Sequence, residues 1–330
     1  MTISDIAKMA GVSSAAVSRY LNGGPLSQQK RAAIQEVVEQ TGYRPDAAAR
    51  TLRTGRVNQI GVIAPSISSQ SVWQITAGIA SVLEQEKYLM LLGSTEMNEE
   101  RELSYFTAMQ HNHVAGIILL GSFYTPELSR AIQNCRVPLV ITGQHFPELP
   151  CVYSDNYGAA RELSRRMLDR GRRKLVYIGG TEGDQQEGIT SCRAGVRDAL
   201  AAAGMDPEQL PRVSCTRFTV EEGHRCMTEL LRLYPDLDGV VCVTENVALG
   251  ALKALKAAGR VVGEDVSLAG IGDSSEAALA EPGITTARFY QKQVGAEAAR
   301  MLLQRLENPD PREPVRQTTL GYSIVDRGSI

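Results

Sequence analysis

The 330-residue sequence lacks several features that would point to metal, catalytic or membrane chemistry. Its six cysteines include no C-x-x-C pair, and its four histidines do not fall at metal-ligand spacing beside them. No G-x-S-x-G elbow and no P-loop is present. No apolar run approaches the ~18 residues of a membrane span, and the N-terminus has no basic-then-apolar leader. We therefore expect free buried thiols, no metal, no cofactor and a cytoplasmic protein.

Charge is unevenly distributed along the chain. The whole sequence carries a net charge of −2. Residues 1–56 contain eight Lys and Arg against four Asp and Glu, whereas the other 274 residues contain 27 against 33, so the two parts carry +4 and −6. A basic head on an acidic body indicates that the head contacts a polyanion and the body does not.

Residues 2–42 read as three short helices. Thr2 and Asp5 fit a capping box that opens the first helix, Ser13 can cap a second helix, and Ser27 can cap a third. Only "GVS" separates the first two helices, which is typical of a helix-turn-helix unit. Apolar residues at helical spacing supply a small core: Ile6, Ala10, Val17, Leu21, Ile34 and Val38.

The second helix lies within "GVSSAAVSRYLNGG", residues 11–24, and carries mostly small side chains. A recognition helix must enter a major groove about 12 Å wide, and small side chains near its start let the backbone come close. Ser13 and Ser14 can hydrogen-bond phosphates or base edges, and Arg19 can reach a guanine or a phosphate. An ordinary small helix remains the alternative for this segment taken alone.

From Asn58 onward, apolar runs of strand length alternate with longer amphipathic segments. This pattern predicts parallel sheets with helices on both faces, divided into two lobes with a ligand cleft at the carboxyl ends of their strands. The runs occupy residues 59–65, 88–94, 115–122, 137–143, 174–180, 238–244, 266–272 and 284–290.

Two ordered motifs, "TISDIAKMAGVSSAAVSRYLNG" and "GYRPDAAARTLRTGRVNQIGVI", resemble the lactose/galactose repressor (LacI/GalR) family, and the resemblance covers essentially the whole chain. It implies an α/β fold with a small all-α helix-turn-helix headpiece and a two-lobed core like that of periplasmic binding proteins. The domains expected are a headpiece at 1–45, a hinge helix and linker at 46–57, and a core at 58–330. Within the core we expect one lobe at about 58–156 plus 288–316 and the other at about 157–287 plus 317–330.

The resemblance also implies DNA contacts. The second helix is expected to read operator bases, and Leu52 in the hinge is expected to wedge into the minor groove and bend the DNA. Asp46 stands where the family usually has Asn, and a carboxylate there repels phosphate if it faces DNA. The DNA-binding residues expected are Ser13, Ser14, Ala15, Ser18, Arg19, Asn22, Ala49 and Leu52.

In the core the resemblance implies an effector site. Trp73, the single tryptophan, is expected to stack on a sugar face, although packing in the core is its alternative. Glu245 stands where the family usually has Asp and is expected to accept hydrogen bonds from sugar hydroxyls. Asp155 and Asp273 are effector contacts or hinge and rim residues, and Phe289 is an effector contact or core.

One mismatch concerns the effector-binding arginine of the family. Counting back from Gly195 without a gap places Cys192 at that position, and Arg193 follows one residue late. Either the backbone shifts by one residue and Arg193 binds the effector, or the contact is lost. An Arg193 that points into the cleft would favour a sugar phosphate, whereas Glu245 alone favours a neutral sugar.

We therefore expect a cytoplasmic, nucleoid-associated bacterial repressor of a carbohydrate operon, controlled by a mono- or disaccharide with or without a phosphate. We expect a homodimer rather than a tetramer, because the sequence ends without the apolar heptads that would build a further helical bundle. Two headpieces require a pseudo-palindromic operator, and we expect no membrane partner. Details of the sequence resemble regulators of sucrose or other disaccharide operons. The alternatives are a catabolite-control regulator that binds a phosphocarrier protein, a sugar-converting enzyme, and a periplasmic sugar carrier.

Overall fold

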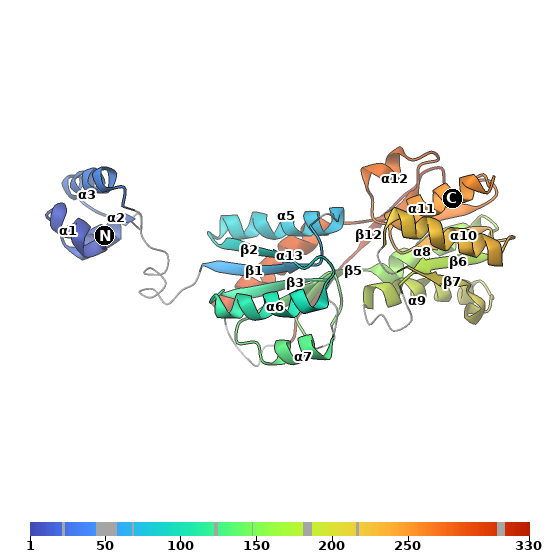
Figure 1. The fold of residues 1–330 in the computed structure, drawn as a ribbon, viewed down its shortest axis with the longest axis horizontal. Coiled ribbons are helices and arrows are strands. Elements are labelled where there is room, and N and C mark those ends of the chain that lie inside the picture. The colour runs from blue at the N-terminus through green and yellow to red at the C-terminus, as the bar shows by residue number, and fades with distance from the viewer. Residues whose placement is uncertain are drawn as a thin grey trace. The chain divides into compact units, whose positions relative to one another are not determined.

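The computed structural model describes residues 1–21, 24–43, 58–67, 69–121, 125–146, 148–180, 187–215, 218–308 and 314–330, with backbone only at 187–190. These residues fall into two compact units, Met1–Val57 and Asn58–Ile330 (Figure 1). In the part of the chain so described, no helix is both long and apolar enough to cross a membrane.

The first unit contains three helices, α1 (Ile3–Met9), α2 (Ser14–Leu21) and α3 (Gln28–Thr41). The expected capping box is present, since the Asp5 amide donates to Thr2 Oγ1 at 3.3 Å and the Thr2 amide donates to the Asp5 carboxylate at 2.8 Å. Ser13 caps α2 by accepting from the Ala16 amide at 3.2 Å. Ser27 occupies the cap position of α3, but its side chain makes no capping hydrogen bond. The helices close over a core of Ile6, Ala7, Ala16, Val17, Ile34 and Val37.

The second unit begins with a six-stranded sheet whose strand order is β11-β5-β4-β3-β1-β2 and whose neighbours all pair in parallel. Helices α5 and α13 cover one face and α6 and α7 cover the other (Figure 1). The strands are β1 (Gln59–Ala64), β2 (Leu89–Ser94), β3 (Gly116–Leu120), β4 (Leu139–Thr142), β5 (Cys151–Ser154) and β11 (Gln317–Leu320). The helices are α5 (Gln70–Gln85), α6 (Glu99–His111), α7 (Pro126–Gln133) and α13 (Gln291–Glu307).

A second six-stranded sheet has the order β12-β10-β9-β8-β6-β7 and is parallel except for the β10–β12 pair. Helix α8 packs with α9 and α10 packs with α11 around one continuous core. The strands are β6 (Leu175–Gly179), β7 (Arg212–Ser214), β8 (Gly239–Cys242), β9 (Ser267–Ile271), β10 (Thr285–Phe289) and β12 (Tyr322–Val325). The helices are α8 (Asn156–Asp169), α9 (Glu187–Ala202), a 3-10 turn (Pro207–Gln209), α10 (Val220–Leu233), α11 (Glu245–Ala257) and α12 (Ser275–Leu279).

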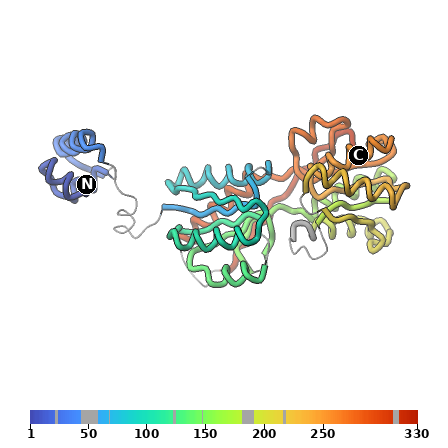
Figure 2. The backbone as a smooth tube through the Cα atoms, viewed as in Figure 1, coloured from blue at the N-terminus to red at the C-terminus, as the bar shows by residue number. Residues whose placement is uncertain are grey.

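The chain crosses between the two sheets at three places, after β5, after β10 and between β11 and β12 (Figure 2). This corrects the lobe boundaries expected from the sequence. Residues 317–320 were expected in the second lobe, but they pair with β5 in the first sheet, whereas residues 288–289 complete β10 in the second. Strand pairing decides this membership, and short strands near a chain crossover give no sequence signal for it.

Strand β2 also differs from expectation. Its apolar run predicts a strand buried on both faces, yet β2 is an edge strand that leaves three leucines exposed: Leu89 at 67%, Leu91 at 42% and Leu92 at 38%. An exposed apolar edge strand is a ready surface for pairing with another chain.

Candidate functional sites in the headpiece and in the interlobe cleft

Helix α2 buries one face and exposes the other. Ala16 and Val17 are buried in the core of the three helices, as the sequence predicts for Val17. The expected DNA contacts Ser13, Ser14, Ala15 and Arg19 are exposed, and Ser18 is half-buried. The opposite side of a buried helical stripe is therefore free to enter a groove. The remaining expected positions, Asn22, Asp46, Ala49 and Leu52, lie outside the described residues.

The end of α2 is held by α3. The Gly24 amide donates to the Arg19 carbonyl at 2.8 Å, and Arg31 Nη2 donates to the Gly24 carbonyl at 3.2 Å. The Arg31 guanidinium also lies 5.8 Å from the centre of the Tyr20 ring. These contacts fix the backbone of Arg19 while its side chain remains exposed.

A cleft of about 660 Å³ lies between the two lobes of the second unit. This volume is within the range of about 300–1,000 Å³ for small-molecule sites. The carboxyl ends of strands from both sheets supply its walls, where open α/β sheets bind ligands. Residues that follow strands in this lining are Pro65, Gly121, Gly143, Asn156 and Val243.

Glu245 is the first residue of α11, is only 9% exposed and lines the cleft. Burial of the carboxylate raises the pKa of Glu245 to about 7, although its own backbone amide acts in the lowering direction. The carboxylates of Asp273 and Glu276 raise this pKa further. The group therefore changes its charge near neutral pH inside the cleft.

Gly272, which follows β9, makes room for the Glu245 carboxylate. A Cβ atom on Gly272 would lie 1.4 Å from Glu245 Oε2, and the φ angle of Gly272 is +123°. Both the space and the backbone conformation require glycine. Sequence reasoning missed this residue; its signal is the second glycine of "GIGD", directly after a buried strand.

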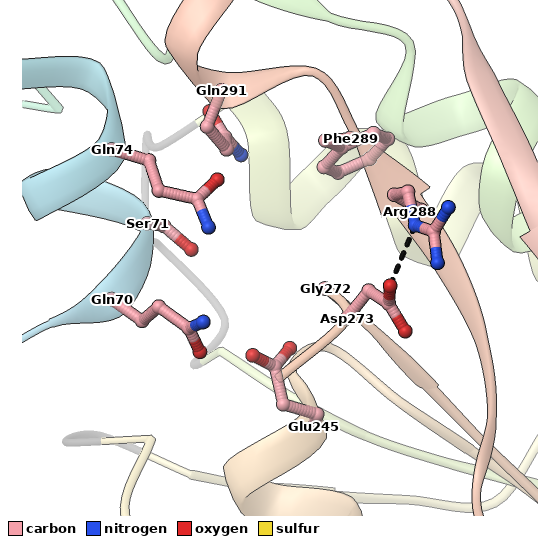
Figure 3. A pocket seen from close by; sticks show the side chains of 9 residues that line it. All are labelled: Gln70, Ser71, Gln74, Glu245, Gly272, Asp273, Arg288, Phe289 and Gln291. Atoms are coloured by element: carbon pink, nitrogen blue, oxygen red, sulfur yellow. Dashed lines mark hydrogen bonds and ion pairs between the residues drawn. The ribbon is translucent and has the colours of Figure 1, made fainter. Parts of the chain in front are cut away.

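Asp273 lines a smaller pocket of about 130 Å³ that shares Gln70, Ser71 and Glu245 with the cleft, and two arginines of the same lobe hold its carboxylate. Arg288 Nε lies 2.6 Å from Asp273 Oδ2 (Figure 3). Arg327 Nη2 lies 2.5 Å from Asp273 Oδ1. Burial acts to raise the pKa of Asp273, but the two guanidinium groups lower it overall. Asp273 is therefore an ionised, paired group, whereas Glu245 has no cationic partner among the described residues.

The opposite wall is neutral. Gln70, Ser71 and Gln74 of α5 face Glu245 and Asp273 across the open space (Figure 3). Ser71 also lines a side pocket of about 180 Å³ that is lined by Val72, Ile75, Phe289 and Thr142, among others. Thr142 is fully buried, and its hydroxyl has no hydrogen-bond partner among the described residues.

Two expected effector residues occupy supporting positions. Phe289 lines the smaller pocket with Asp273 and the side pocket, and it also packs against the core of the second lobe. Asp155 caps α8 by accepting from the Gly158 amide at 2.7 Å. The next residue, Asn156, lines the cleft. Of the two alternatives for Asp155, this position corresponds to a hinge residue.

Trp73 is placed differently from the expectation. It is 64% exposed and lines none of the described pockets, although Val72 lines the cleft and Gln74 lines the smaller pocket beside it. At about 100° per residue, Gln70, Gln74 and Ser71 share a sector of about 100° on the helix surface, and Trp73 lies about 60° outside the edge of that sector.

The ungapped count places Cys192 in the cleft lining, and Arg193 is not part of that lining among the described residues. Arg193 instead acts electrostatically on the buried Tyr177. The expectation that Arg193 binds the effector therefore has no support from its position.

The described lining residues combine hydroxyl, amide and carboxylate groups with apolar side chains. Arg288 is the sole cation in this described lining, and it is paired with Asp273. No group of three or more His, Cys, Asp or Glu in the described parts of the chain could hold a metal. This arrangement is suited to a neutral, hydroxyl-rich ligand.

Known proteins match the chain in both units. Residues 2–46 match the family described as bacterial regulatory proteins, lacI family, and residues 165–330 match the periplasmic binding protein-like domain. The HTH-type transcriptional regulator CelR of Thermobifida fusca is 33% identical over 327 residues, which cover 96% of this chain and 94% of CelR. The sucrose operon repressor of Staphylococcus xylosus is 29% identical over 306 residues, which cover 93% of this chain and 94% of the repressor.

Solved structures show the same similarity. A structure of a CelR transcriptional regulator in complex with cellobiose superposes with a TM-score of 0.75 at 27% identity. The match covers 100% of this chain and 99% of the CelR chain. The helical headpiece and the two-lobed core are thus found together in a sugar-bound relative.

Proposed function

Because the chain belongs to the lacI family of bacterial regulatory proteins, we propose that it represses sugar-utilisation genes and releases its operator when a neutral disaccharide fills the interlobe cleft. It is a transcriptional regulator of that family. We propose further that it acts in the cytoplasm on the nucleoid and that it does not convert the sugar.

The polarity of the cleft carries this proposal. Glu245 lies opposite the amides of Gln70 and Gln74, so a carboxylate acceptor and neutral donors face each other across a gap (Figure 3). Sugar hydroxyls both donate and accept, and they can bridge such walls. A sugar phosphate is disfavoured, because the described lining supplies no unpaired cation to meet it.

The size of the site favours a disaccharide over a single ring. The cleft continues through Ser71 into the side pocket, where apolar Val72 and Ile75 suit the C–H face of a second ring. The similar proteins named for cellobiose and for a sucrose operon support this choice.

For the DNA side, we propose that α2 reads operator bases through Ser14, Ala15, Ser18 and Arg19, with Ser13 on a phosphate. Asn22, Ala49 and Leu52 retain their expected contacts as part of the same proposal. The exposed edge of β2 supports a homodimer, and two headpieces require a pseudo-palindromic operator.

Operator release tests the proposal. DNA selected from a random library by the purified protein supplies the operator, and gel-shift titrations at fixed salt then include cellobiose, sucrose, glucose or glucose 6-phosphate. We expect a neutral disaccharide to release the DNA and to be recovered unchanged, while glucose 6-phosphate has no effect. Release by the phosphate alone, or consumption of the sugar, would contradict the proposal.

Arg19→Ala tests the headpiece. We expect specific binding to weaken by about 1–3 kcal/mol if Arg19 reads a base. Lys30→Ala removes a basic side chain from exposed α3 and serves as the control for charge alone. Equal losses in both variants would show that α2 makes no base-specific contact through Arg19.

A further inference from the structure

The side pocket opens from the cleft where the strands of the first sheet end. It has a volume of about 180 Å³ and shares Pro65, Ser71 and Asn156 with the cleft. None of the described residues that line it carries an ionisable side chain. A ligand group that fills this pocket is therefore recognised by neutral hydrogen-bonding groups and by shape.

Thr142 is the last residue of β4 and forms part of the wall of this pocket. Its backbone is fixed by the neighbouring strand, because the Gly121 amide donates to the Thr142 carbonyl at 2.9 Å. Side chains alternate along a strand, so Thr142 lies on the same face of the sheet as Val140, which packs with Ile75 of α5 in the core. The Thr142 side chain is thus directed toward α5, where the side pocket lies.

The Thr142 hydroxyl differs from those of the other buried threonines in the described chain. Thr95, Thr285 and Thr286 each donate a hydrogen bond to a carbonyl or carboxylate oxygen at 3.3–3.4 Å. Thr142 is fully buried, yet its hydroxyl has no hydrogen-bond partner among the described residues. A buried hydroxyl without a partner destabilises a folded chain, and a valine of nearly the same shape would not. A partner that arrives with the ligand would account for a hydroxyl at this position.

We propose that the Thr142 hydroxyl binds the hydroxymethyl group of a hexose ring in the side pocket, and that Thr142 thereby makes the protein select hexose over pentose disaccharides. This inference rests on the proposed function and names the class of sugar for the same site. The hydroxymethyl oxygen both donates and accepts hydrogen bonds, as the Thr142 hydroxyl does, so the two groups satisfy each other. A pentose ring has no such group and leaves the Thr142 hydroxyl without a partner.

The depth of Thr142 is what selects the hydroxymethyl group. Because Thr142 is fully buried, a ligand atom must reach past the mouth of the pocket to meet its hydroxyl. The other hydroxyls of a pyranose are attached directly to the ring, whereas the hydroxymethyl oxygen stands one carbon further out on a rotatable bond. The methylene group of this arm suits the apolar side chains of Val72, Ile75 and Leu120, which line the same pocket.

Calorimetric titration of the full-length protein with cellobiose and with xylobiose tests the inference, because xylobiose is cellobiose without its hydroxymethyl groups. We expect the wild type to bind cellobiose with a Kd about fivefold or more below that for xylobiose. Thr142→Val should remove this preference by raising the Kd for cellobiose, while the Kd for xylobiose changes by less than about twofold.

Denaturant titration without sugar supplies a second measurement. We expect Thr142→Val to be at least as stable as the wild type, because no hydrogen bond of the described chain is lost. Thr285→Val is the matched control, since Thr285 is buried, is hydrogen-bonded and lines none of the described pockets. It should lose stability and keep the preference for cellobiose.

A preference for cellobiose that survives in Thr142→Val would overturn the inference and leave the proposed function standing. A loss of stability in Thr142→Val as large as that in Thr285→Val would also overturn it, because the hydroxyl would then already have a partner such as a bound water. Failure of both disaccharides to bind the wild type would overturn it as well, and sucrose, titrated in parallel, then decides whether the proposed disaccharide ligand fails with it.

Discussion

The two lobes of the core are built alike but present different chemistry to the cleft between them. The first lobe offers neutral side chains at the start of α5, whereas the second offers two carboxylates. Each carboxylate is positioned by its own lobe: Glu245 by the space above Gly272, and Asp273 by Arg288 and Arg327. The second lobe therefore holds its two carboxylates in fixed positions and, in the proposed function, anchors the sugar. The first lobe offers amide and hydroxyl groups that can pair with many arrangements of sugar hydroxyls.

The outer edges of the two sheets differ as well. Strand β2 of the first sheet is six residues long and exposes three leucines, while the edge strand β7 of the second sheet has three residues and none that is fully exposed. Short edge strands protect against pairing, and long apolar ones invite it. We propose on this ground that the first lobe supplies the surface for a second copy of the chain.

The greatest change is expected in self-association, when charges are placed on the exposed edge of β2. Replacing Leu89 and Leu91 together by Asp places two charges on the β2 edge, and we expect self-association to weaken by about 30-fold or more. Sedimentation velocity across a concentration series measures this. Leu233→Asp, at a 47% exposed position of the second lobe, is the matched control and should sediment like the wild type. Equal behaviour of both variants would remove β2 from the dimer contact.

Gly272→Ala comes next, because it displaces the anchor of the second lobe. The added methyl group meets Glu245 Oε2, so we expect the sugar Kd to rise by about 10- to 100-fold, as for loss of a charge-assisted hydrogen bond. Gly204→Ala is a sharp control, since Gly204 also has a left-handed φ of +74° but open space around it. Both variants should lose stability, and only the first should lose affinity. A Gly272→Ala variant with wild-type affinity would contradict the anchor.

The two walls of the cleft should also differ in pH dependence, because Glu245 titrates near neutral pH and the neutral side chains of α5 do not. Its pKa is about 7 in the folded chain against an ordinary 4.5, so ionisation opposes folding. The free energy of unfolding of the wild type, relative to that of Glu245→Gln, should be highest below pH 4.5. It should fall by about 3 kcal/mol as the pH rises from 4.5 through 7, because the unfolded chain ionises first. Over the same interval the sugar Kd should fall, because a carboxylate accepts hydroxyl hydrogen bonds better than its acid does. Denaturant titrations and calorimetry at several pH values check both slopes, which Glu245→Gln should flatten.

A smaller effect is expected on the neutral wall. Gln74→Ala removes one uncharged hydrogen-bonding group from α5, and we expect the sugar Kd to rise by about 2- to 12-fold. Because Gln74 does not titrate, this factor should stay constant with pH, unlike that of Glu245→Gln. A loss as large as that of Gly272→Ala would mean that the first lobe, too, anchors the ligand.

The sequence predicts what short-range chemistry determines. The Thr2–Asp5 capping box and the Ser13 cap involve residues three apart, so the pattern that predicts each helix also contains its cap. Eight apolar runs predicted β1 to β4, β6 and β8 to β10, whereas the short strands β5, β7, β11 and β12 contain no such run and were not predicted. Strand β2 shows the limit: its run looks buried, and only the strand order places it at an edge.

The cleft depends on long-range packing, which explains what the sequence left open. Glu245 was predicted from its position in the resemblance, yet the need for Gly272 appears only when β9 and α11 are packed together. Phe289 was predicted for the same reason as Glu245, and it lines two pockets beside the cleft. Asp155 and Arg193 each lie next to a residue that lines the cleft. Asp155 caps α8 instead, and Cys192, one residue before Arg193, takes the position in the lining.

Trp73 gives the smallest expected effect and the sharpest test of the walls as described. Since Trp73 is 64% exposed and is not part of the described cleft lining, we expect Trp73→Ala to change the sugar Kd by less than about twofold, as surface substitutions usually do. Saturating sugar should also leave the intrinsic emission of the wild type unchanged, because Trp73 is its only tryptophan. Gln74→Ala, one residue along the same turn of α5, is the matched comparison and should have the larger effect on Kd. The reverse order would mean that α5 presents its other face to the ligand, so that the Trp73 ring, and not the Gln74 amide, contacts the sugar.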